Sequence, residues 1–280
     1  MDLRPFRSAG FARLAIAYWV NEFGTWIGEI ALTILVYNRT GSALSTAALF
    51  IGLRSAPAVL APLLTTRIET VRPRLALSTL YVLEAVIYGG IAVLTRHFSL
   101  PAVLVLGALD GCLAVAAKAI TRSATAASLT ADGLLREGNA ILNLGVMAAT
   151  ACSPLVAGAL IASKGAGPAL LVDSATFLVT AAIISSAREI RLETARGASW
   201  GARLHRGVTV IRTRRAVKSL MFAIAMTFLL CAIPAPIDVV FVKHVLHGGD
   251  AGYGLMLGAW GLGMVVGAAS FAAFDQVRLM

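Results

Sequence analysis

The chain has 280 residues, 58% of them hydrophobic and only 14% charged, with a mean hydropathy of +0.83 and a formal net charge of +10. A soluble domain carries about 25% charged residues, so this composition excludes an ordinary soluble protein and favours one that crosses a membrane several times. The positive charge is accounted for by Lys and Arg in cytoplasmic loops, and it does not indicate nucleic acid binding.

Apolar runs of about 20 residues recur along the chain, and each is long enough to cross a hydrocarbon core of roughly 30 Å as a helix. Short connections rich in Gly, Pro or Asn separate them. The predicted spans are about 14–37, 43–66, 75–94, 100–120, 139–162, 168–186, 220–242 and 251–274. The sequence therefore predicts an all-α polytopic membrane protein with about eight transmembrane helices.

One long polar segment, residues 188–218, separates six of these spans from the other two. It holds nine Lys or Arg against two acids, Glu189 and Glu193. Its first part, 188–200, is typical of an exposed linker, whereas 201–218 has apolar residues at near-helical spacing among arginines. We expect an amphipathic helix on the cytoplasmic membrane face. Its arginines either bind anionic lipid headgroups or simply fix the topology.

The distribution of basic residues predicts the orientation of the spans. If the N-terminus is cytoplasmic and the spans alternate, nineteen Lys and Arg lie inside, including Lys118 at the inner end of span 4, and four lie outside. Because cytoplasmic loops are enriched in Lys and Arg, we expect both termini and the polar segment to be cytoplasmic.

Six carboxylates and one basic residue, Arg54, lie within the predicted spans. An ionised side chain at the bilayer centre costs roughly 2.5–3.5 kcal/mol on insertion scales, so these acids are either protonated or in contact with water. The acids are Glu22, Glu29, Glu84, Asp110, Asp173 and Asp238.

Span 1 carries the most informative pattern. Glu22 and Glu29 are seven residues apart, so they share one helix face to within about 20°, and Thr25 lies on the same stripe. Gly24 and Gly28 form a pair of small residues suited to close packing on another helix. The acids either act in transport or, for one of them, pair with Arg54.

The other acids allow more than one interpretation. Asp110, in the middle of span 4, has either a transport role or a local partner. Asp173 is expected to make a structural hydrogen bond near the outer end of span 6. Asp238 follows Pro234 and Pro236, where a broken helix would free backbone carbonyl groups close to an acid.

Several short segments, taken together and in their order along the chain, resemble sequences of the major facilitator superfamily of secondary transporters. Within it they are most similar to the branch of enterobactin exporters and macrolide-efflux permeases. The matching segments are FARL (11–14), GTW (24–26), VYNRTGSA (36–43), RSA (122–124), SP (153–154), LVDSATF (171–177) and the glycine-rich stretch 254–267. No single segment is highly specific for the family, but the order in which they follow one another along the chain is.

The resemblance implies two six-helix bundles joined by a long cytoplasmic loop. Residues 1–187 would form the first bundle, 188–218 the loop, and 219–280 the first two helices of a second bundle, so the last four helices would be lacking. Glu69, Arg72 and Arg74 occupy the position of the family's cytoplasmic gating motif, although the motif's glycine is replaced by Thr65.

The resemblance also implies the function of a secondary active transporter of the efflux type, exporting a small amphipathic molecule such as a drug, macrolide or siderophore by alternating access. The alternative is a truncated remnant that does not transport. A proton-coupled exporter needs acids that titrate as the cavity opens to each side, and Glu22, Glu29, Asp110 and Asp238, with Thr25, are the candidates for this pathway. Arg54 and Asp173 are expected to be structural.

The same resemblance places the protein in the bacterial inner membrane. Its expected partners are the transported molecule, protons and anionic lipid headgroups. The sequence has no phosphate-binding glycine loop, HExxH motif or serine–histidine constellation, so neither an enzyme nor a cofactor or metal site is expected.

Overall fold

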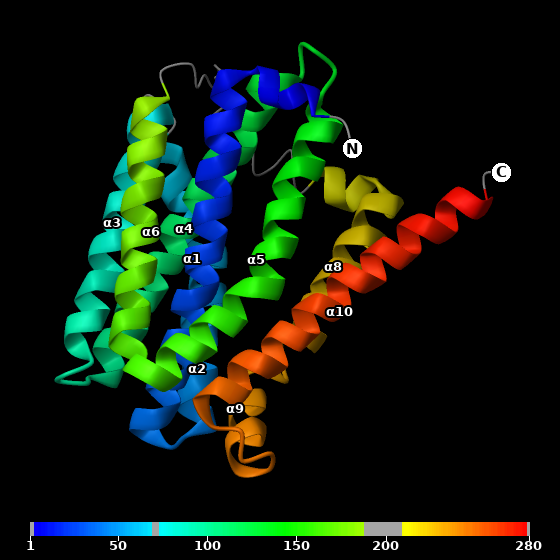
Figure 1. Cartoon of the computed structure of the whole chain (residues 1–280). Coiled ribbons are helices and arrows are strands. Elements are labelled where there is room, and N and C mark those ends of the chain that lie inside the picture. Colours follow the sequence, from blue (N-terminus) through cyan, green and yellow to red (C-terminus); the bar gives the residue numbers. More distant parts are fainter. Residues whose placement is uncertain (1–2, 69–72, 188–208, 279–280) are drawn as a thin grey trace.

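A computed structural model describes residues 3–68, 73–187 and 209–278, and every regular element in these ranges is a helix (Figure 1). The prediction of an all-α protein is therefore confirmed. Two residues of the expected gating motif, Glu69 and Arg72, and the first two thirds of the polar segment lie outside the described residues. The elements are η1 (Arg4–Arg7), α1 (Ala9–Thr40), α2 (Ala43–Ile68), α3 (Pro73–Leu94), α4 (Leu100–Leu129), α5 (Leu135–Lys164), α6 (Ala166–Ser186), α8 (Arg215–Ala232), α9 (Ala235–His244) and α10 (Gly249–Arg278).

Local sequence signals fix the ends of α1. The Ser8 hydroxyl accepts a hydrogen bond from the Phe11 amide at 3.4 Å, which satisfies one of the free donors of the first turn. At the other end, Gly41 adopts φ +60° and its amide bonds the Tyr37 carbonyl, because glycine enters the left-handed region without a steric penalty. Between these caps the chain runs as one helix of 32 residues.

Five of the described helices are long and apolar enough to cross a membrane, namely the ranges Arg74–Leu94, Leu100–Leu129, Leu135–Lys164, Ala166–Ser186 and Gly249–Ser270. Helix α1 is long enough but less apolar, because it carries Asn21, Glu22 and Glu29. The predicted span 7 is divided into α8 and α9 at Pro234. This break confirms the prediction of an interrupted helix next to Asp238.

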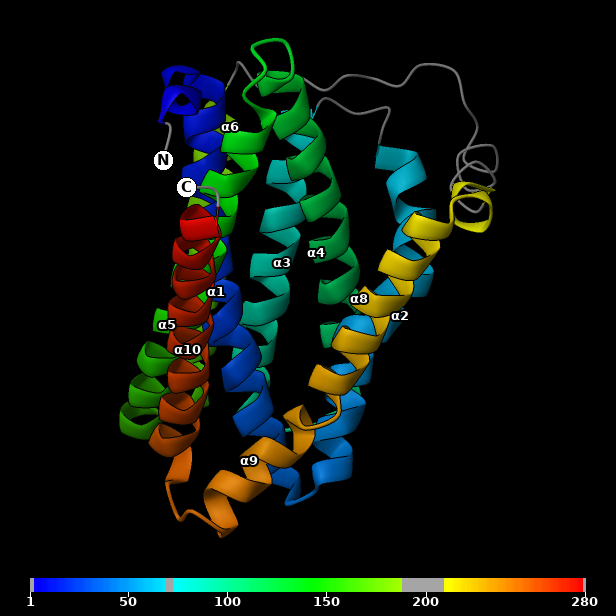
Figure 2. The same cartoon turned by 90° about the vertical axis from the view of Figure 1, so that its right-hand side faces the viewer.

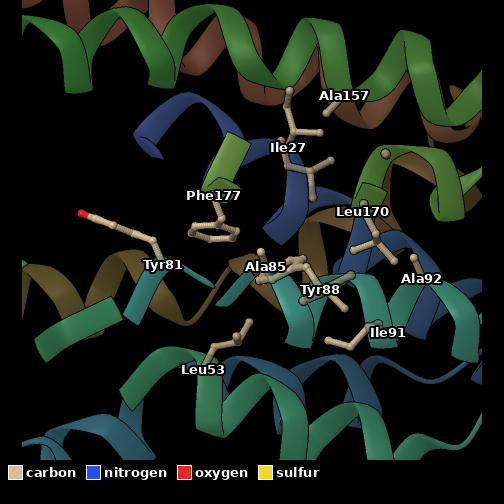
Figure 3. Close-up of a cluster of buried hydrophobic side chains, with 14 of the residues drawn as sticks. Ile27, Leu53, Tyr81, Ala85, Tyr88, Ile91, Ala92, Ala157, Leu170 and Phe177 are labelled. Atoms are coloured by element: carbon tan, nitrogen blue, oxygen red, sulfur yellow. The ribbon is translucent and has the colours of Figure 1, made fainter. Parts of the chain in front are cut away.

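Helix α1 is central to the first six helices, where it packs against α5 and α6 and also touches α2 and α4 (Figure 2). The pairs α3–α6 and α2–α4 complete the arrangement. Two side chains join α3 to α6: the Ser174 hydroxyl donates to the Ala85 carbonyl at 2.7 Å, and the Ser78 hydroxyl donates to the Ala181 carbonyl at 3.3 Å. Figure 3 shows the core between these helices, in which the Tyr88 and Phe177 rings lie 5.5 Å apart.

Helix α10 crosses α5 by direct backbone contact. Gly254, Gly258 and Gly261 follow one another at helical spacing and face α5, where Gly158 stands opposite Gly254. A Cβ atom at Gly254 would lie only 2.6 Å from Cα of Gly158. Small residues let helix backbones approach this closely. Farther along α10, nothing lies within 4 Å of such an atom at Gly263 or Gly267, and the helix diverges from α5 (Figure 1).

The two ends of the helix bundle differ in how they are joined. At the end where α1 begins, the Arg13 guanidinium donates to the Ser186 carbonyl at 2.9 Å, which places the start of α1 beside the end of α6. At this end α8 and α10 lie away from α1 (Figures 1 and 2). At the opposite end, α9 contacts both α1 and α2. The last helices are therefore attached at the end where α1 finishes.

Candidate functional site

The predicted acidic stripe of α1 lies within the first six helices. Glu22 is buried, whereas Glu29 and Thr25 are half-buried. The spacing of seven residues keeps the two carboxylates on one face of the helix, but they do not share a partner. Each acid meets a cation from a different neighbouring helix.

Glu29 forms an ion pair with Arg54 of α2, with Nη2 of the arginine 2.8 Å from Oε2 of the glutamate. The side chains are 52% exposed for Arg54 and 23% for Glu29. The alternative of local pairing raised by the sequence is therefore realised at Glu29. Because the pair is partly exposed, the helices do not fully enclose it.

Glu22 forms the second ion pair, with Lys118 of α4, at 3.0 Å between Nζ and Oε1. This corrects the sequence analysis, which counted Lys118, at the inner end of span 4, among the cytoplasmic cations and treated Arg54 as the only intramembrane cation. Helix α4 continues to Leu129, so Lys118 lies inside the helix. The signal was available, because the sequence between Ala114 and Leu129 has neither Gly nor Pro to end a helix.

The glycine pair of α1 faces α6, as predicted for a helix-packing seam. A Cβ atom at Gly24 would lie 2.6 Å from Oδ1 of Asp173, and one at Gly28 would overlap Oδ2 of the same carboxyl. Asp173 is fully buried and accepts a hydrogen bond from the Thr176 hydroxyl at 3.2 Å. The backbone of α1 therefore rests directly on the Asp173 side chain.

The structure separates the remaining predicted residues. Asp110 is buried on α4, within electrostatic range of Glu29 and Asp173. Asp238 is half-buried in the first turn of α9, outside the first six helices. Arg74 lies in the first turn of α3 with a half-buried side chain. The acids of α1 and α4 thus lie together, and Asp238 and Arg74 stand apart from them.

A polar cluster that the sequence analysis did not predict joins α1 to α9 and α10. The Lys243 ammonium contacts both the Asp250 carboxylate and the side-chain oxygen of Asn38, and it lies 5.7 Å from the centre of the Tyr37 ring. The Asn38 amide also reaches Asp250 at 3.4 Å. His244 packs edge-on to Tyr37. We call Tyr37, Asn38, Lys243 and Asp250 the terminal cluster, since it lies where α1 ends.

Replacing Lys243 with methionine should loosen this end of the molecule, because Asp250 and Asn38 lose the cation that holds them together. Nitroxide labels on a cysteine-free background at Leu44 and Leu246, both exposed, would report the change by pulsed dipolar spectroscopy. We expect a broader distribution of label separations with a longer mean. Lys164→Met, at the exposed end of α5, is the control, and an identical distribution in the two variants would contradict the role of the cluster.

The sequence was compared with the models of known protein families. The model of the transmembrane secretion effector family, within the major facilitator superfamily, matches residues 1–278. The chain belongs to this family. Among curated proteins, none matches the chain.

Membership of the family makes the chain a multi-pass membrane transporter, and an efflux function agrees with the family's description. The two ion pairs give such a protein charged groups inside its membrane helices. Each of them joins α1 to another helix of the first six, so a change in the charge of Glu22 or Glu29 would alter how α1 is held. In a protein that moves its helices during transport, protonation of these acids can thus be coupled to movement of α1.

Proposed function

We propose that the protein is a proton-coupled exporter of a small amphipathic molecule, such as a drug, a macrolide or a siderophore. It would act by alternating access in the inner membrane of a bacterium. The observation that carries the proposal is the partly exposed pair of Glu29 and Arg54. A charge inside a membrane helix is expensive unless it is paired or in contact with water. An ion pair inside a membrane protein that its helices do not fully enclose is typical of a transport pathway.

Glu29 is the proposed carrier of the coupling proton. Protonation of Glu29 would release Arg54, and deprotonation would restore the pair at 2.8 Å. Glu22 with Lys118 repeats the arrangement closer to the start of α1. Thr25, Asp110 and Asp238 complete the proposed pathway, with Asp238 contributed by the broken helix of the second half. Alternating loss and gain of these pairs would let α1 tilt as the cavity changes sides.

The proposed topology has both termini in the cytoplasm, in accordance with the distribution of basic residues. The described part of the basic segment supports its interaction with anionic lipid headgroups. Arg212, Arg214 and Arg215 are exposed, whereas Ile211 and Val217 are half-buried. Residues 209–213 are helical and α8 begins at Arg215, and a segment with this pattern can lie at the membrane surface with its arginines toward the phosphates. We also propose that Arg74 acts with Glu69 and Arg72 as a cytoplasmic gate.

Glu29→Gln tests the proposed carrier, because it preserves the shape of the side chain but removes its charge. In vesicles with an imposed pH gradient, export of ethidium, erythromycin and a catecholate siderophore would be followed together with internal pH. We expect the native protein to export at least one probe. The variant should lower its rate about tenfold or more, equivalent to roughly 1.4 kcal/mol.

The matched control is Asp132→Asn, which removes an exposed carboxylate from the turn between α4 and α5. It should export at the native rate. Intact pH-driven export by Glu29→Gln would exclude Glu29 as the carrier, and the absence of export of every probe by the native protein would count against this substrate class.

A further inference from the structure

Three acids and a tyrosine that the ion pairs do not use lie together inside the first six helices. Glu84 and Tyr88 are four residues apart on α3, and therefore on the same face of that helix. Asp110 comes from α4 and Asp173 from α6. At most 5% of each of these four residues is exposed. We call Glu84, Tyr88, Asp110 and Asp173 the buried acid cluster.

Two observations show that the members are neighbours. Glu84 lies within electrostatic range of Asp110 and Asp173, and Asp110 lies close to the Tyr88 hydroxyl. Asp173 and Tyr88 also approach the same point of α1, since a Cβ atom at Gly28 would overlap Oδ2 of Asp173 and lie 2.5 Å from Cε1 of Tyr88. The cluster is therefore enclosed by α3, α4 and α6, with α1 against it.

Most polar atoms of the cluster lack a hydrogen-bond partner of good geometry. Both carboxyl oxygens of Glu84 are without one, as are Oδ1 of Asp110, Oδ2 of Asp173 and the Tyr88 hydroxyl. The interaction between Tyr88 and Asp110 thus falls short of a well-formed hydrogen bond, although the fully buried hydroxyl is directed into the cluster. Buried polar groups are normally satisfied, so this concentration of unpaired oxygens indicates a site for something that binds them.

Neither a protein cation nor a metal ion accounts for these carboxyls. Arg54 of α2 and Lys118 of α4 are already paired with Glu29 and Glu22. Lys118 is also eight residues from Asp110, about 12 Å along the helix axis. In the part of the chain that the structure describes, no three acids, cysteines or histidines converge as metal ligands would. What remains is the smallest cation, the proton.

We propose that the buried acid cluster is a second proton-binding site, separate from the ion pairs on α1. Carboxylates that share an apolar site are not all ionised, because each negative charge opposes the next and none is solvated. The charged groups that face the cluster are Glu29 on α1 and Lys118 on α4, with Glu22 of α1 behind Lys118, and the Tyr81 hydroxyl lies on α3 beside Glu84. The use of this proton in transport rests on the proposed function, whereas its presence does not.

The cluster can pass its charge state to α1 through the glycine seam. Asp173 lies against Gly24 and Gly28 with no side chain between its carboxyl and the α1 backbone. A neutral carboxyl is compatible with this dry contact. An ionised one needs water, and water cannot enter unless α1 moves away from α6. Loss of the proton would thus shift the helix that carries Glu22 and Glu29.

Infrared spectroscopy of the full-length protein in lipid vesicles tests the site, with the proton itself as the probe. Protonated carboxyl groups have a carbonyl stretch distinct from that of carboxylates, and it shifts in deuterium oxide. We expect this band in the native protein at neutral pH. Glu84→Gln, Asp110→Asn and Asp173→Asn should each reduce it. Tyr88→Phe should move the band without removing it, since its hydroxyl faces Asp110.

Asp132→Asn is the control and should leave the band unchanged. The absence of the band from the native protein would overturn the proposal, and so would a band that persists at full strength in all three single variants. Three separate variants keep the test decisive if one of them does not fold. The measurement needs no substrate, so it is independent of the proposed function. A carbonyl band in a protein that exports no probe would support the proton-binding site and contradict the export function. Export by a protein without the band would support the export function and contradict the site.

Discussion

Gly261→Ala is expected to destabilise the protein, because α10 and α5 meet there backbone to backbone. The added methyl group would overlap the Thr150 carbonyl oxygen and lie 2.8 Å from Cα of Ala151. Neither atom is at the end of a flexible side chain, so the helices themselves must separate. Overpacking of this kind costs about 1–3 kcal/mol, and backbone contact favours the upper part of that range. Thermal unfolding of the protein in detergent would measure the loss.

Gly263→Ala provides the matched control two residues away. Nothing lies within 4 Å of a Cβ atom at Gly263, and this residue is exposed. Because alanine favours a helix more than glycine does, by about 0.5–1 kcal/mol, this variant should be as stable as the native protein or more so. Equal unfolding temperatures for the two variants would refute the close crossing of α5 and α10.

Lys118→Met is expected to have the second large effect. It leaves the Glu22 carboxylate buried within the helices without its cation. A buried group that loses its partner in this way costs about 1–3 kcal/mol, and more when it is charged. The ammonium is partly exposed, at 46% of its side chain, so we expect the lower part of the range given for breaking fully buried pairs, roughly 3 kcal/mol. Thermal unfolding again measures the change.

A double-mutant cycle separates this pair from its surroundings. Glu22→Gln together with Lys118→Met removes both charges and should recover most of the lost stability, because no unpaired ion remains. Exchanging the two charges, Glu22→Lys with Lys118→Glu, tests whether the ion pair still stabilises the protein when the cation is on α1 and the anion on α4. If the double neutral variant were as unstable as the sum of the single variants, the two residues would not interact.

The helices themselves were predictable because a membrane span needs a minimum length of apolar sequence. The glycine seam of α1 was also predictable, because Gly24 and Gly28 belong to one helix and their spacing alone places them on the same face. Lys118 was assigned to the cytoplasm because it lies only two residues before the predicted inner end of span 4. The helix extends nine residues past the predicted end at 120, and a long lysine side chain tolerates a position inside it.

The buried acid cluster could not be predicted from the sequence. Glu84, Asp110 and Asp173 come from three helices, and hydropathy gives the length of a helix but not its rotation about its own axis. Their meeting depends on how α3, α4 and α6 pack. The terminal cluster was beyond prediction for the same reason, since Asn38 and Lys243 are brought together only when α9 folds back onto α1.

The crossing of α10 over α5 also has a mechanical consequence. The close backbone approaches at Gly254, Gly258 and Gly261 lie in the first half of a helix that continues to Arg278, so the crossing acts as a pivot with one long arm. Seventeen residues beyond Gly261 extend about 25 Å at 1.5 Å per residue. A tilt of about 10° at the pivot therefore carries the far end of α10 by roughly 4 Å, while the glycine contacts themselves scarcely move.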